Sequence, residues 1–117
     1  MVQPALIPGS LKRVEEVFTA SESDVLRDTD LRQAPGAGAI GFWAASDVAD
    51  STITIRVGGA SLINAQVVGN RGATSPIQEN QEAPTAMAPV RGGELLQVDV
   101  VEVTAMNLRL VAIFVAA

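Results

Sequence analysis

The densest group of side chains that could do chemistry is acidic and lies in the first third of the chain. Asp28 and Asp30 flank Thr29, and Glu22 and Asp24 precede them. Hard cations such as Ca²⁺ prefer oxygen ligands, so Asp24, Asp28 and Asp30 are the candidate metal ligands. Their spacing lacks the glycine and the distal glutamate of an EF-hand loop. We therefore favour a solvated acidic turn, and we expect neither a metal nor a cofactor.

The same carboxylates could serve a glycoside hydrolase, but the rest of the composition argues against catalysis. A sugar-binding cleft is normally lined with aromatic side chains, and this chain has one Trp and no Tyr. Histidine and cysteine are absent, which excludes disulfides, thiol chemistry, Cys/His zinc sites and nucleophiles activated by histidine. A serine nucleophile would depend on the single lysine, Lys12, which lies beside Arg13 and Glu15. We predict that the protein is not an enzyme and has no catalytic residue.

Three closely spaced glycines, Gly36, Gly38 and Gly41, superficially match a phosphate-binding loop. Such a loop acts by joining a strand to the N-terminus of a helix. No strand is predicted before these glycines and no helix after them. We interpret them as turn glycines.

Length and charge narrow the class of protein further. The 117 residues are enough for one domain with a single core, and the apolar share of 48% is typical of a globular chain. The net charge is −5 and the eight basic residues are scattered, so we expect no nucleic-acid partner. No signal peptide is visible, and the most apolar run, 108–117, contains Arg109 and is far shorter than the about 20 residues that span a bilayer. We expect a soluble protein made in the cytoplasm, with no membrane partner.

The elements that would position these residues are strands. Ile53, Ile55 and Val57 alternate with polar residues, Gly58-Gly59 suits a two-residue turn, and alternation resumes over 60–68, which predicts a hairpin. Another strand is predicted within 94–104, where the apolar doublet Val100-Val101 indicates a β-bulge or a change of sheet. The run 108–115 is apolar on both faces, so we expect it to be the most buried strand.

The first 45 residues are less regular. Residues 14–20 fit a short helix or a strand, and we favour the strand because the downstream pattern is β. Residues 39–45 predict a strand with Ile40 and Phe42 on one face and Trp43 on the other. Trp43 could fill one end of the core or anchor an interface, where Trp is enriched.

Two segments do not fit a compact meander. Residues 1–10 are proline-containing and predict an extended N-terminal arm, while 73–90 form a long loop with three prolines and no periodicity. The prediction is an all-β chain: a single antiparallel β-sandwich or jelly-roll-like domain of about seven to eight strands over 11–117. We expect the arm and the loop to reach neighbouring subunits. The candidate interface residues are Pro4, Leu6, Ile7, Trp43, Pro76, Ile77 and Met87.

Four stretches carry a resemblance to a family: 31–36, 40–46, 50–59 with its Gly-Gly turn, and 89–96 leading into two apolar strands. Short strands, Gly-Gly turns and abundant Ala, Val and Thr over 30–117 resemble the small β-sandwich virion proteins of bacteriophages, of the minor capsid and cement (decoration) type. The resemblance transfers no site residue.

The resemblance implies a subunit made in the host cytoplasm and located in the virion. Its expected partners are further copies of itself, in a homo-oligomer such as a trimer, and a major capsid protein. The alternatives are a ligand-binding β-sandwich of the adhesin or carbohydrate-binding type and, ranked last, a carboxylate hydrolase.

Overall fold

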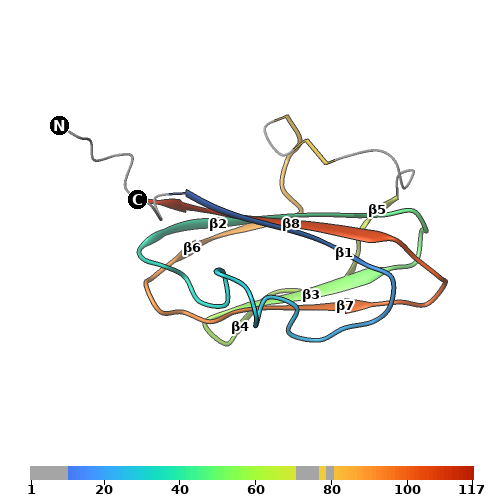
Figure 1. Cartoon of the computed structure of the whole chain (residues 1–117), viewed down its shortest axis with the longest axis horizontal. Helices are drawn as coiled ribbons and strands as arrows, with labels where there is room; N and C mark the ends of the chain where they lie inside the picture. The colour runs from blue at the N-terminus through green and yellow to red at the C-terminus, as the bar shows by residue number, and fades with distance from the viewer. Residues whose placement is uncertain (1–10, 71–76, 79–80) are drawn as a thin grey trace.

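The computed structural model describes residues 11–70, 77–78 and 81–117. They form eight strands in two facing sheets, with no helix among them, which confirms the predicted all-β fold and single β-sandwich domain (Figure 1). The predicted arm at 1–10 and six residues of the predicted loop, 73–76 and 79–80, lie outside the described residues. The strands are β1 (Leu11–Phe18), β2 (Gly38–Ser46), β3 (Thr52–Val57), β4 (Ala60–Val67), β5 (Gly69–Asn70), β6 (Ala86–Val90), β7 (Leu96–Val101) and β8 (Leu108–Ala116).

The larger sheet brings together strands from both ends of the chain. Its order is β1-β8-β2, and the far edge of β2 is shared by β6, which is antiparallel, and by the two-residue β5, which is parallel. The smaller sheet has the order β4-β3-β7, all antiparallel. The apolar strand β8 is therefore interior, paired with β1 on one side and with β2 on the other.

The predicted hairpin is present as β3 and β4. Gly58 and Gly59 form its turn with φ values of 58° and 85°, the left-handed region that glycine adopts without a steric penalty. Ile53 and Ile55 point into the core. The register of β4 on β3 shifts twice, and Ala65 at one irregular position has φ 48°, with its N–H donating to Thr54 Oγ1 at 2.9 Å. These irregularities interrupt the outer edge of the smaller sheet.

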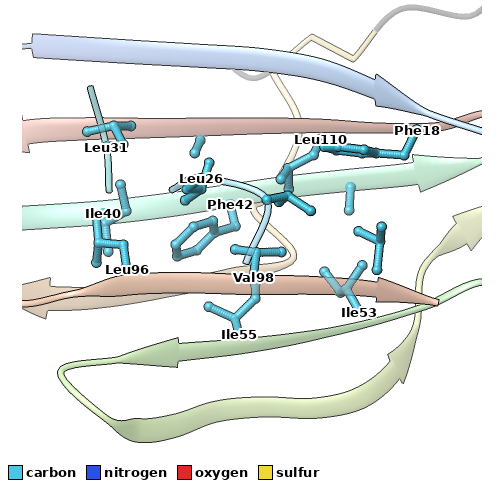
Figure 2. Packing of buried hydrophobic residues seen from close by; sticks show 14 of the residues in the cluster. Phe18, Leu26, Leu31, Ile40, Phe42, Ile53, Ile55, Leu96, Val98 and Leu110 are labelled. Carbon is cyan, nitrogen blue, oxygen red and sulfur yellow. The ribbon is translucent and has the colours of Figure 1, made fainter. Parts of the chain in front are cut away.

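The core lies between the two sheets, as Figure 2 shows, and Ile40 and Phe42 are fully buried in it, as predicted. The connection between β1 and β2 also contributes: Leu26 and Leu31 are fully buried. Its backbone follows the outer edge of β7, where Glu22 and Val100 exchange two hydrogen bonds of 3.0 and 2.9 Å. The connection thus closes one side of the sandwich and covers a sheet edge.

Several expectations about the strands were wrong. The doublet at 100–101 forms neither a β-bulge nor a change of sheet, because β7 pairs with β3 without a register shift up to its end at Val101. β8 is not the most buried strand: five of its nine residues are buried, against six of the nine in β2. The segment 86–90 is not loop but strand β6, since it finds a free edge of β2 and edge strands accept proline.

Candidate interaction face

The acidic residues near the start of the chain are spread out in space. Asp28 and Asp30 have side chains 92% and 82% exposed, and each lies near a base: Asp28 is 3.7 Å from Arg27, and Asp30 is 3.9 Å from Lys12. Asp24 lies in the connection, where its backbone N–H donates to Asp99 Oδ1 at 2.8 Å. Within the described residues no three His, Cys, Asp or Glu side chains converge as a metal site would require.

Two of the three glycines interpreted as turn residues lie inside strand β2, so that interpretation was wrong for Gly38 and Gly41. A Cβ on Gly38 would collide with the backbone oxygen of Val115 on β8. A Cβ on Gly41 would lie 2.9 Å from two carbons of the Trp43 ring. The absence of a side chain at Gly41 therefore lets the indole lie flat across the sheet.

Trp43 lies on the outer face of the larger sheet, opposite the sandwich core. Its indole Nε1 donates to the backbone oxygen of Glu82 at 2.9 Å. Ile77 is 7% exposed and packs with Trp43, Ala45 and Val111 in a second, smaller apolar cluster. Trp43 thus fastens the segment before β6 onto the outer face, and Figure 1 shows that segment above the larger sheet.

A hollow of about 200 Å³ adjoins this cluster and is bounded by Trp43, Ile77 and Thr85. The Thr85 hydroxyl accepts a hydrogen bond of 3.0 Å from the backbone N–H of Ala44. Pockets that hold organic ligands usually measure about 300–1,000 Å³, so the hollow is small for a sugar ring with its contacts.

Beyond Trp43, the same outer face carries apolar side chains on β1, β2, β6 and β8. Register places Leu11, Val115, Ala39 and Pro89 in one transverse row. The next row contains Ile113, Gly41 and Met87. Leu11 is 60% exposed, Met87 59% and Val115 48%. We call this surface the apolar patch; its residues are Leu11, Ala39, Trp43, Met87, Pro89, Ile113 and Val115.

The outer face of the smaller sheet is mostly polar, with Val67 and Val101 exposed on either side of Thr52 at one end. The outward positions of β3 are Thr52, Thr54 and Arg56, and those of β7 include Gln97 and Asp99. Arg56 and Asp99 form an ion pair of 3.2 Å across the two strands. Antiparallel sheets normally keep one polar face in water, and the smaller sheet does so. The larger sheet departs from this rule at the apolar patch.

Next to the apolar patch, two bases on the larger sheet share one acid. Glu15 accepts a hydrogen bond of 2.8 Å from Arg109 and pairs with Arg13 at 3.0 Å. The bond from Arg109, followed by that from Arg13, holds the pKa of Glu15 below its ordinary value against the opposing effect of burial. A partner covering this face would therefore meet an ion network that is already paired.

The structure separates the predicted interface residues into three groups. Pro4, Leu6, Ile7 and Pro76 lie outside the described residues. Ile77 is buried within the chain, and Trp43 is half-buried against it. Met87 is exposed at the edge of the apolar patch.

Sequence reasoning missed Leu11, Ile113 and Val115. The signal for Ile113 and Val115 was present in the run 108–115, which is apolar on both faces, whereas Leu11 lies outside that run. A strand that is apolar on both faces need not be buried on both, and Val115 is exposed on the outer face.

No protein-family model, curated protein or solved structure matched the chain. In the part of the chain that the structure describes, no helix is long and apolar enough to cross a membrane.

Proposed function

We propose that this chain is a structural virion protein of a bacteriophage, a capsid cement or decoration subunit or a minor capsid subunit. It is made in the host cytoplasm and stabilises a shell through protein–protein contacts. The observation that carries the proposal is the apolar patch, which covers four strands of one sheet while the outer face of the other sheet is mostly polar. Contiguous exposed apolar surface in a small domain is a mark of protein contact.

The shape and charge of the face support a protein surface as its partner. Small ligands are held in concave sites, whereas the apolar patch lies on a strand surface. The adjoining Arg13 and Arg109 already pair with Glu15, so covering these side chains leaves each of them with an ion partner. The proposed partner is the surface of the shell formed by the major capsid protein.

The proposal is tested in particles of the phage whose genome carries this sequence. Quantitative mass spectrometry of gradient-purified particles should find many copies of the chain. Met87→Asp places a charge in the apolar patch and should lower the copy number at least tenfold. Gln97→Asp places the same charge on the other sheet and should leave it unchanged within twofold.

Two results would overturn the proposal: particles that lack the wild-type chain, or particles that retain the Met87→Asp and Gln97→Asp variants equally. Circular dichroism of both purified variants checks that each is folded.

A further inference from the structure

Strand β1 is a long and uninterrupted sheet edge. Its eight residues pair with β8 on one side, and the described backbone hydrogen bonds of β1 run to no other segment. An edge strand of this kind presents a row of donors and acceptors to which another strand can add. No bulge or proline interrupts it.

The other described edges are protected. The connection after β1 covers the outer edge of β7 through hydrogen bonds at Glu22, Val25 and Arg32. Two register shifts and the positive φ of Ala65 distort β4. β6 is short and carries Pro89. Natural sheets use such devices, and also charged side chains, against edge-to-edge pairing. Of these, β1 has only its charges: Lys12, Arg13, Glu15 and Glu16.

The sequence of β1 is complementary to its own reverse. Antiparallel pairing of two copies centred on Val14 sets Leu11 opposite Val17, Lys12 opposite Glu16, and Arg13 opposite Glu15. Each base thereby faces an acid, and the two exposed apolar residues, Leu11 at 60% and Val17 at 50%, face each other. Opposite charges directly across a strand pair stabilise it, and like charges destabilise it.

The register is fixed by the same charges. Residues directly opposite each other in a sheet lie on the same face. The two-fold centre of a symmetric strand pair must therefore fall on a residue, and the nearest alternatives to Val14 are Arg13 and Glu15. Centring on Arg13 would set Arg13 against itself, and centring on Glu15 would set Glu15 against itself. The pairing centred on Val14 avoids both repulsions.

We propose that β1 binds β1 of a second copy of this chain, antiparallel and about a two-fold axis at Val14. The two larger sheets then form one continuous sheet. Because the axis is perpendicular to the sheet, both apolar patches face the same way, with Leu11 and Val17 joining across the new strand pair. A dimer of this geometry presents two copies of the patch to one surface, which strengthens attachment through multivalency. The proposed oligomer is thus a two-fold dimer and not the expected trimer.

The test uses complementary charge variants of the full chain. Lys12→Glu leaves acids at both 12 and 16, and Glu16→Lys leaves bases at both, so neither variant should pair with itself. An equal mixture should pair, because each acid then faces a base. Native mass by light scattering at about 50 µM should show twice the 12.1 kDa of one chain for the wild type and for the mixture, and one chain for each variant alone.

Arg27→Glu is the matched control, since it makes the same charge change in the connection, away from β1, and should remain a dimer. The inference is overturned if the wild type is a monomer at this concentration, if either charge variant alone remains a dimer, or if the mixture stays monomeric. Mixing separates lost pairing from misfolding, because a misfolded variant would not be rescued.

The solution dimer and the proposed function can fail separately. If the chain is a dimer in solution but is absent from phage particles, the virion role is wrong and the β1 pairing stands. If the chain is a monomer in solution but is present in particles, the β1 pairing is wrong and the virion role stands.

Discussion

At the scale of single residues, a small residue on the outer face of the larger sheet makes room for the side chain of a large one. Gly41 is the clearest case, because the Trp43 indole occupies the space where any side chain would project. The sequence places both residues on one face of a strand, but only the folded position of the Trp43 side chain shows that the ring turns back over Gly41.

We predict that Gly41→Ala destabilises the protein by about 1–3 kcal/mol, since the added carbon would lie 2.9 Å from the ring and the indole must move. Movement would also weaken the bond from Trp43 to the Glu82 backbone. Urea unfolding measures the loss, and the fluorescence of Trp43, the single tryptophan, should shift to longer wavelength. Gly36→Ala, where a Cβ meets nothing within 4 Å, should stay within about 0.5 kcal/mol of wild type.

The ion network around Glu15 predicts a pH dependence. Because Arg109 and Arg13 lower the pKa of Glu15 in the folded protein, its contribution to stability is present above the pKa of the unfolded chain. The contribution is lost as the pH falls through the lowered folded value. Glu15→Gln should therefore melt below wild type at pH 7, and the difference should shrink towards zero in strong acid. A constant difference in melting temperature from pH 7 to pH 2 would contradict this.

Asp47 should contribute to stability with the same pH dependence as Glu15. Its carboxylate accepts hydrogen bonds from the side chain and the backbone N–H of Asn107, and these bonds lower its pKa. Glu15 is the better position for the experiment, because its partners Arg13 and Arg109 lie on two paired strands, β1 and β8.

At the scale of elements, alternation in the sequence predicts the strands that have one apolar face. The hairpin of β3 and β4, with its Gly-Gly turn, is the best example. β2 is apolar on both faces and was predicted from the apolar run at 39–45. β6 was missed because Ala86-Met-Ala-Pro-Val has little contrast between faces and contains a proline. A strand of that composition forms because β2 offers it a partner, and the local sequence does not encode that partner.

The connection between β1 and β2 is an element without regular structure that still fills the core. We predict that Leu26→Ala costs about 2–5 kcal/mol, as for other fully buried leucines, because the connection is held to β7 and cannot collapse into the cavity. Val103→Ala, at a side chain 70% exposed, should change stability by less than about 0.5 kcal/mol. Urea denaturation of both variants measures the contrast, and equal small losses would show that the connection is not part of the core.

At the scale of the whole molecule, the two outer faces differ in kind. The fold class could be predicted because it depends on local periodicity. The apolar patch could be predicted only at Trp43 and Met87, because its rows combine β1, β2, β6 and β8, which are remote in the sequence. Leu11 and Val115 become neighbours only when the last strand inserts between the first two. A surface formed by long-range register has no signature within any one segment.

The asymmetry between the faces predicts a solubility difference that needs no partner. Exposed apolar surface favours association of like molecules, so a charge placed in the apolar patch should oppose it. Met87→Asp should raise the polyethylene glycol concentration at which half of the protein precipitates, relative to wild type. Gln97→Asp adds the same charge to the polar face and should raise it less. Since net charge alone also improves solubility, the difference between the two variants isolates the patch. Equal shifts would mean that the apolar patch contributes nothing to self-association.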